Sequence, residues 1–272
     1  MTRVAIITNA AQGIGEAIAY KLSSDGIDVA LADLPNKRHA LEQVVKTIQG
    51  SGRKAIPIIC DISKGNEVQD MVKKAVVLFG GLDVMVANAG TMGYSSILER
   101  RTILLPGCGD SNDQTRARLK GAMNSAGYCV SKFGVRALTQ TAALEWGQYD
   151  ITVNAYAPGY IDTPMITETG GGSHGENFLP LLRNSGLERM GEPEEIAAVV
   201  VFLALEGASY VTGESTLART IAQSFVLMGH LKDNRWVQME VTCSVSWCYV
   251  YHGRQRNNTR AALTGATGGY GR

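Results

Sequence analysis

The sequence predicts an α/β protein, a single domain built on a doubly wound parallel sheet. Short segments rich in Val and Ile alternate with longer segments that repeat apolar residues every three or four positions, four times over before Gly90. This alternation of strands and helices is typical of a parallel sheet with helices on its faces. With 272 residues, 45% of them hydrophobic, the chain is long enough to bury a substantial core.

Residues 4–22, VAIITNAAQGIGEAIAYKL, predict a strand, a tight turn and a helix. The first N–H groups of a helix lack partners and lie at the positive end of its dipole, so they favour an anion. Gly13 and Gly15 have no Cβ, which lets a diphosphate approach the main chain. Taken alone, the turn is equally typical of a simple glycine-rich corner, but the motifs below favour a dinucleotide. The turn residues expected to hold it are Asn9, Gln12, Gly13, Ile14 and Gly15.

The second predicted strand, residues 28–32, ends in Asp33, which lies 18 residues after Gly15. A carboxylate there accepts hydrogen bonds from the adenosine ribose and repels a 2′-phosphate, which favours NAD over NADP. Lys37 and Arg38 follow closely and are compatible with a phosphate, so NADP stays possible. The alternative is that Asp33 is an ordinary turn aspartate.

A helix over 38–50, a strand over 54–59, a further helix and a strand over 84–87 complete this half of the chain. Asp61 follows the third strand and Asn88 the fourth. Ligands of parallel sheets bind at the carboxyl ends of the strands, so we expect both residues at the same edge as the glycine turn. Three neighbours, Ile62, Ala89 and Gly90, are expected to contribute to the same cofactor site.

A long helix from about Tyr128 to Trp146 carries Tyr128 and Lys132 four residues apart, on one face. A free tyrosine has a pKa near ~10, so acid–base work near neutral pH requires that pKa to fall by a few units. A lysine ammonium one turn away favours the phenolate. On an arbitrary helix such a pair is a surface pair; the edge described above makes it a catalytic candidate.

Further along, residues 151–155 predict a buried strand, and residues 193–205 a helix. The interval up to Arg189 is interpreted as a loop, with residues 170–172 as hinges of a mobile lid or as part of a plain surface loop. Pro158 and Gly159 turn the chain away from the end of this strand, and Ile161 and Thr163 follow.

Composition excludes several other functions. The net charge of +1 gives no field for nucleic acid or an anionic membrane. The longest apolar run, residues 196–205, is too short to cross a bilayer, and a strand pattern from Val4 leaves no room for a signal peptide, which predicts a cytoplasmic protein. Five cysteines without paired or ligand spacing predict neither a metal site nor a disulfide framework.

These motifs together resemble the short-chain dehydrogenase/reductase family. Its turn, Thr-Gly-x-x-x-Gly-x-Gly, corresponds to residues 8–15, with Asn9, a residue that tolerates left-handed geometry, in place of the first glycine. The other matching positions are Asp61, Asn88 to Gly90, Tyr128, Lys132, Pro158, Gly159, Thr163, 191–197 and 208–213. The resemblance implies a Rossmann-type fold and an NAD(P)-dependent oxidoreductase. In it, Tyr128 and Lys132 carry out the chemistry and also contact the cofactor. It also implies that the residues after the strand contact the cofactor, namely Pro158, Gly159, Ile161 and Thr163.

The wording of residues 10–19, 31–34 and 128–140 is most similar to diacetyl/acetoin reductases and butanediol dehydrogenases. This branch implies a small ketone, diketone or secondary alcohol as the substrate. The family usually forms homo-oligomers through the Tyr/Lys helix and its successor, whereas a missing last strand would argue against that assembly here.

The resemblance covers residues 1–99 and 125–215 and departs from the family twice. An atypical insert, 100–124, replaces a helix and a strand that carry an asparagine and a substrate-binding serine, which disrupts the central crossover. Residues 1–215 are therefore expected to form the NAD(P)-binding domain, and 216–272 a partly disordered extension outside the family pattern. Within it, Leu217, Ile221 and Phe225 predict a helix. An alternative is a catalytically impaired nucleotide-binding protein, or an aberrant splice or frame-shift product of such an enzyme.

Overall fold

The computed structural model describes residues 2–90, 126–166, 182, 187–218 and 226–228; for 126–128, 216–218 and 226–228 it describes the backbone alone. The insert predicted over 100–124, the lid over 170–172 and the extension beyond 229 lie outside the described residues.

Four parallel strands form the first sheet, in the order β3-β2-β1-β4. They are β1 (Val4–Thr8), β2 (Asp28–Asp33), β3 (Ala55–Ile59) and β4 (Val84–Val86). Every residue of β1, β2 and β4 is buried, as expected for strands covered on both faces. The predicted parallel sheet is confirmed.

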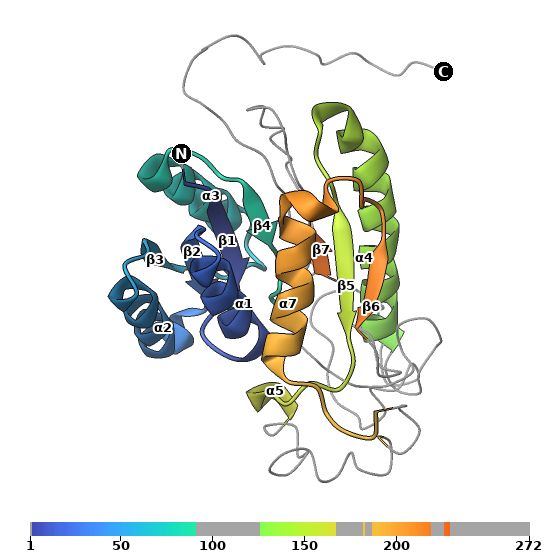
Figure 1. Ribbon diagram of the computed structural model, residues 1–272, viewed down its shortest axis with the longest axis horizontal. Coiled ribbons are helices and arrows are strands. Elements are labelled where there is room, and N and C mark those ends of the chain that lie inside the picture. The colour runs from blue at the N-terminus through green and yellow to red at the C-terminus, as the bar shows by residue number, and fades with distance from the viewer. Residues whose placement is uncertain (1, 91–125, 167–181, 183–186, 219–225, 229–272) are drawn as a thin grey trace.

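Helices cover the strands in two layers. The helices of this part are α1 (Gly13–Ser24), α2 (Arg38–Gly50), α3 (Gly65–Phe79) and α7 (Pro193–Ala204), with a short 3-10 turn η1 (Pro35–Lys37) before α2. In Figure 1, α1 and α7 lie side by side in front of the strands. Their apolar residues, such as Ile18, Leu22 and Val200, are fully buried in one core with the strands. This packing places the first turns of α1 and α7 near one another.

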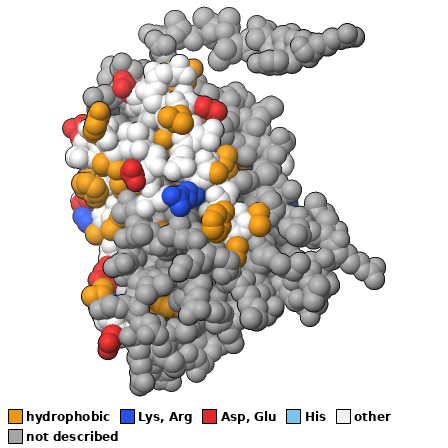
Figure 2. All heavy atoms as spheres, turned by 90° about the vertical axis from the view of Figure 1, so that its right-hand side faces the viewer, with side chains coloured by type: hydrophobic (Ala, Val, Ile, Leu, Met, Phe, Trp, Pro, Cys, Tyr) orange, Lys and Arg blue, Asp and Glu red, His pale blue; other side chains and the backbone are white. Residues whose placement is uncertain are grey.

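The second half of the fold contains α4 (Ala126–Trp146), behind β5 in Figure 1, and a short α5 (Pro164–Ile166). Between α4 and β5 lies a 3-10 turn, η3 (Gly147–Tyr149), and after α7 another, η6 (Glu206–Ala208). The inner face of α4 packs Trp146 and Val135 against Ile151 and Val153. Its outer face exposes Val130, Phe133 and Leu144. Figure 2 shows hydrophobic side chains scattered over the described part of the face that it views.

A second sheet pairs β5 (Asn154–Pro158) with β6 (Ser215–Ala218) in parallel and with β7 (Val226–Met228) in antiparallel orientation. The strand predicted over 151–155 therefore begins three residues late. The Val153 N–H donates to the Thr212 hydroxyl (3.0 Å) and not to a strand, and the side-chain amide of Asn154 donates to the Val211 carbonyl (2.6 Å). Both groups are thereby occupied by the loop before β6.

The helix predicted from Leu217 is wrong for the described residues, because 215–218 and 226–228 are strands. The apolar spacing that suggested a helix is outweighed by pairing with β5 on both of its edges, a long-range contact that local pattern does not report. Strand β6 also crosses the boundary predicted at residue 215, so the expected break in the fold does not interrupt the sheet there.

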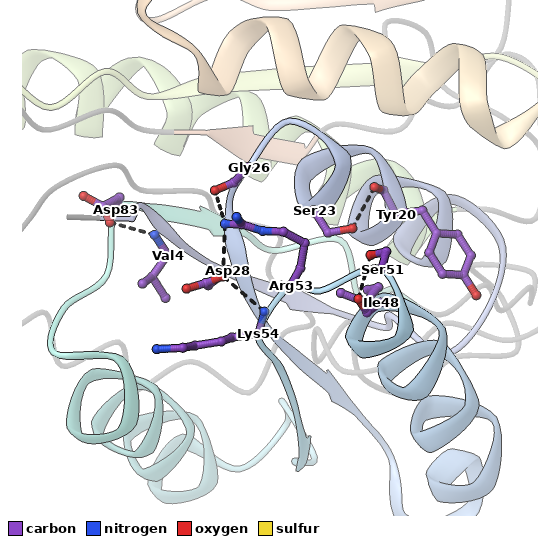
Figure 3. A network of polar contacts seen from close by, with 10 residues as sticks. All are labelled: Val4, Tyr20, Ser23, Gly26, Asp28, Ile48, Ser51, Arg53, Lys54 and Asp83. Atoms are coloured by element: carbon purple, nitrogen blue, oxygen red, sulfur yellow. Dashed lines mark hydrogen bonds and ion pairs between the residues drawn. The ribbon is translucent and has the colours of Figure 1, made fainter.

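A polar network ties together the amino ends of the strands, at the edge opposite the turn after β1 (Figure 3). The Arg53 guanidinium donates to the Gly26 carbonyl and to Asp28 Oδ1 (3.1 Å for the latter). The Val4 N–H donates to Asp83 Oδ2 at 2.7 Å. These bonds give the buried Asp28 and Asp83 carboxylates hydrogen-bond partners at the amino ends of β2 and β1, so they stabilise this edge of the sheet.

Candidate active site

The carboxyl ends of the parallel strands bring the predicted polar residues to one edge of the first sheet. Asp33 is the last residue of β2, while Asp61 and Asn88 each follow their strand by two residues. The glycine turn follows the last residue of β1, Thr8. Since the strands run in one direction, all four features lie along the same edge.

The turn between β1 and α1 has backbone geometry that few residues adopt. Asn9 has φ 53° and Gly13 φ 58°, both in the left-handed region. A Cβ on Gly15 would lie 2.1 Å from the Asn9 carbonyl oxygen and 2.7 Å from Asn88 Nδ2. Gln12 precedes the helix without a side-chain cap, and Ile14 packs against the core. The first N–H groups of α1 are therefore left for a ligand above the turn.

Asn88 joins β4 to this turn through its side chain. Its amide donates to the carbonyls of Thr8 (3.2 Å) and Asn9 (3.4 Å), and its Oδ1 accepts from the Tyr156 hydroxyl at 3.0 Å. The N–H of Ala89 donates to Thr8 Oγ1 at 2.9 Å. Tyr156, fully buried in β5, was missed by sequence reasoning, because nothing near it in the sequence signals this partner.

Asp33 is buried and ties β2 to the same turn. Its Oδ2 accepts the Ala11 N–H at 2.9 Å, and its Oδ1 accepts the Leu34 N–H at 2.8 Å. Lys37 reaches back to the turn, and its Nζ donates to Gln12 Oε1 at 2.7 Å. A carboxylate and an ammonium therefore both lie at the end of β2, beside the glycine turn.

Asp61 lies farther along the edge, after β3, and caps its own loop. Its Oδ1 accepts the Ser63 hydroxyl (2.7 Å) and the Ser63 N–H (3.0 Å), and the hydroxyl bond holds the pKa of Asp61 below its usual value. Its backbone N–H donates to Glu67 Oε2 at 2.8 Å. The next residue, Ile62, is half-buried against the core.

Lys132 is nine-tenths buried and lies beside the end of β4. Its Nζ is 3.9 Å from the point where a Cβ on Gly90 would lie. Tyr128 is in the first turn of α4, four residues before Lys132, so the backbone places the two on one face of the helix. The side chain of Tyr128 lies outside the described part of the chain.

The residues after β5 return to the glycine turn. Pro158 ends the strand, Gly159 follows, and the buried Ile161 pairs with Gly191. A Cβ on Gly13 would lie 3.2 Å from the Thr163 methyl group. The structure thus brings Thr163 to the first turn of α1, although 150 residues separate it from Gly13.

The arrangement fits a dinucleotide. The turn is compact, since a Cβ at Gly15 would collide with the Asn9 carbonyl and Asn88. The first N–H groups of α1 suit a diphosphate, and the Asp33 carboxylate lies beside the turn, at the end of β2. The Lys132 ammonium and the backbone of the first turn of α4 lie at the β4 end of the same edge.

Comparison of the chain with known proteins establishes its family. A family model described as short chain dehydrogenase matches residues 3–102, and one described as Enoyl-(Acyl carrier protein) reductase matches residues 115–218. A short-chain dehydrogenase/reductase of Armillaria gallica is 39% identical over 242 residues, which cover 78% of this chain and 93% of that protein. The chain belongs to the short-chain dehydrogenase/reductase family. It therefore has the Rossmann-type fold and the oxidoreductase relatives that its motifs predicted.

Other short-chain dehydrogenases/reductases show the range of substrates among similar proteins. An L-2,3-butanediol dehydrogenase of Corynebacterium glutamicum is 33% identical over 250 residues, covering 80% of this chain and 97% of its own. A crystal structure of levodione reductase is 27% identical with a TM-score of 0.69 and covers 80% of this chain and 96% of its own. A variant actinorhodin polyketide ketoreductase with NADPH is 27% identical with a TM-score of 0.68, covering 80% and 95%.

Two further findings concern the described residues alone. They contain no group of three or more His, Cys, Asp or Glu side chains placed to hold a metal ion. They also contain no helix with the length and apolar character needed to cross a bilayer.

Cys60 and Cys129 are buried free thiols, and burial raises the pKa of Cys60 to about 11, so this thiol stays protonated near neutral pH.

Proposed function

We propose that this short-chain dehydrogenase/reductase interconverts a small ketone or diketone and the corresponding secondary alcohol, with diacetyl and acetoin as representative substrates. The observation that carries the proposal is the position of Lys132, buried beside Gly90 and one helical turn after Tyr128, at the edge that also holds the glycine turn. A butanediol dehydrogenase and diacetyl reductases among the relatives support this substrate class.

The residues divide the work by position. The turn with Gly13 and Gly15 would hold the diphosphate of a nicotinamide dinucleotide, and Asp33 its adenosine ribose. When bound, the nicotinamide supplies or accepts a hydride. Tyr128 gives a proton to the substrate oxygen in reduction and takes it back in oxidation. Lys132 lowers the pKa of Tyr128, because a positive ammonium one helical turn away stabilises the negative phenolate.

We propose NAD as the preferred cofactor. The Asp33 carboxylate at the end of β2 would repel a 2′-phosphate, which supports NAD, whereas Lys37 beside it is compatible with NADP. NADPH is present in the crystal structures of a similar polyketide ketoreductase and a similar blue fluorescent protein, so both cofactors need measurement. We expect NADH to bind with a Kd roughly tenfold lower than that of NADPH. The repulsion between a 2′-phosphate and the buried Asp33 carboxylate should outweigh the attraction between that phosphate and Lys37.

The proposed substrate class is tested with a panel of carbonyl compounds. Purified protein is assayed for NADH oxidation with diacetyl, acetoin, cyclohexanone and a 3-oxoacyl thioester, because relatives of each type are known. The highest kcat/KM is expected for diacetyl. A preference for the thioester overturns the substrate class, and NADH binding without turnover on any compound supports a catalytically impaired binding protein instead.

We infer that the chain also forms a homo-oligomer through α4. Its outer face exposes Val130, Phe133 and Leu144, an apolar surface that a second copy of the helix would cover. The presence of β6 beside β5 supports this assembly, because the second sheet, against which α4 packs, continues past residue 215.

A further inference from the structure

The segment before α7 contains an ion pair that the proposed function does not use. The Arg189 guanidinium donates from Nη1 to Glu195 Oε2 at 2.8 Å and from Nη2 to Glu195 Oε1 at 2.7 Å. The Glu192 N–H donates to the same Oε2 at 2.8 Å. One carboxylate of α7 therefore accepts three hydrogen bonds from residues 189–192, two of them in the parallel geometry that is strongest for Arg. This holds the segment in one path over the first turn of α7.

The backbone of this segment pairs with the residues that follow β5. The Gly191 N–H donates to the Tyr160 carbonyl at 2.8 Å, and the Asp162 N–H donates to the Gly191 carbonyl at 2.9 Å. A Cβ on Gly191 would lie 2.8 Å from Ile161 Cδ1, so the two segments approach as closely as glycine permits. The position of residues 160–162 therefore depends on the path of residues 189–192.

Thr163 connects residues 160–162 to the glycine turn. Thr163 follows directly, and its Cγ2 is 3.2 Å from the point where a Cβ on Gly13 would lie. Pro164 lies slightly farther from the same point, at 3.8 Å. Short contacts thus run without interruption from the Arg189–Glu195 pair, through Gly191 and residues 160–162, to the turn expected to hold the diphosphate.

We propose that Arg189 and Glu195 are positioning residues that set the affinity for the dinucleotide by holding Thr163 against the glycine turn. This rests on the proposed function, because it concerns the same cofactor site. Both side chains are about half exposed, 52% for Arg189 and 48% for Glu195, so the pair adds little to global stability. Its effect is to order the 160–163 segment before the ligand arrives, so that binding does not bear that entropy cost.

The charge state of the pair is constant across the conditions of such a test. The Arg189 hydrogen bonds lower the pKa of the Glu195 carboxyl to about 2, so Glu195 is ionised throughout the neutral range. The same pair raises the pKa of Arg189. Changes in dinucleotide affinity among variants therefore report the loss of the ion pair and not a shifted titration.

The test measures NADH affinity by fluorescence titration in Arg189→Ala, Glu195→Gln and the double variant, together with steady-state kinetics. We expect each single variant to raise the Kd and the KM for NADH by roughly three- to fivefold while kcat changes less than twofold. The double variant should be no worse than either single one, because both remove one interaction. Arg189→Lys keeps the positive charge but cannot form the two parallel hydrogen bonds of the guanidinium. Its NADH Kd should fall between those of wild type and Arg189→Ala.

A matched control is the exposed ion pair Lys21–Asp25 at the other end of α1, with an N–O distance of 2.7 Å. Lys21→Ala should leave the NADH Kd unchanged. If the Arg189 and Glu195 variants lower the melting temperature while NADH affinity stays at the wild-type value, the pair is merely structural and the proposal is overturned. If the wild type itself binds no dinucleotide, the proposed function fails and the positioning role fails with it.

Discussion

Replacement of Lys132 by methionine is expected to lower kcat for diacetyl reduction by about 10²- to 10⁴-fold, the usual range for loss of acid–base assistance. Lys132 is nine-tenths buried, and its Nζ lies next to Gly90 at the end of β4. Without the ammonium, the Tyr128 phenol loses the charge that favours its ionised form. The NADH Kd should rise less than kcat falls, since the glycine turn remains intact. Steady-state kinetics and a fluorescence titration measure the two effects separately.

Lys74→Met is the matched control, because Lys74 is an exposed lysine of α3. It should leave kcat and the NADH Kd unchanged. Methionine is close in length to lysine, so the fold of Lys132→Met should survive, and circular dichroism with a thermal scan checks this. A folded Lys132→Met variant with kcat within threefold of wild type would remove Lys132 from the mechanism.

Gly15→Ala is expected to lower the free energy of unfolding by about 3 kcal/mol and to raise the NADH Kd at least tenfold. The added methyl group would lie 2.1 Å from the Asn9 carbonyl oxygen, a backbone atom that cannot move aside without distorting the turn. It would also lie 2.7 Å from Asn88 Nδ2 and so disturb the bonds from Asn88 to Thr8 and Asn9. Urea denaturation and NADH titration measure the two losses.

Gly50→Ala provides the comparison, since a Cβ there meets nothing within 4 Å and Gly50 is the last residue of α2. Alanine should be neutral or slightly stabilising at that position because it has the higher helix propensity. Equal stability and NADH affinity in Gly15→Ala and wild type would show that the turn does not have the tight packing on which the cofactor site depends.

Local pattern was sufficient for the elements whose residues carry their own signals. The helix predicted over residues 38–50 has those bounds in the structure, because its apolar stripe and the strands around it are distinct in the sequence. Asparagine was expected to tolerate a left-handed backbone in place of the family glycine, and Asn9 does adopt φ 53°. The edge shared by Asp33, Asp61 and Asn88 followed from strand direction alone.

Long-range contacts were the part that sequence reasoning did not reach. The bond from Tyr156 to Asn88 joins residues 68 apart, and the pairing of β6 and β7 with β5 replaced a predicted helix. Residues 191–197 were recognised as a family segment. The ion pair of Arg189 with Glu195, and the contacts that link it to Gly13, could not be predicted from that segment. In each case the deciding partner lies on another element, where residue spacing carries no information.

The proposed mechanism is tested most directly by the NADH fluorescence of one sample, recorded first as NADH binds and then after diacetyl is added. The measurement is made for wild type and for Tyr128→Phe. The phenol gives its proton to the substrate oxygen and takes no part in the glycine turn, so the two proteins should bind NADH with similar Kd. Wild type should then oxidise NADH when diacetyl is added, whereas Tyr128→Phe should leave it unchanged. Failure of the wild type to bind NADH, or turnover by Tyr128→Phe at the wild-type rate, would contradict the account.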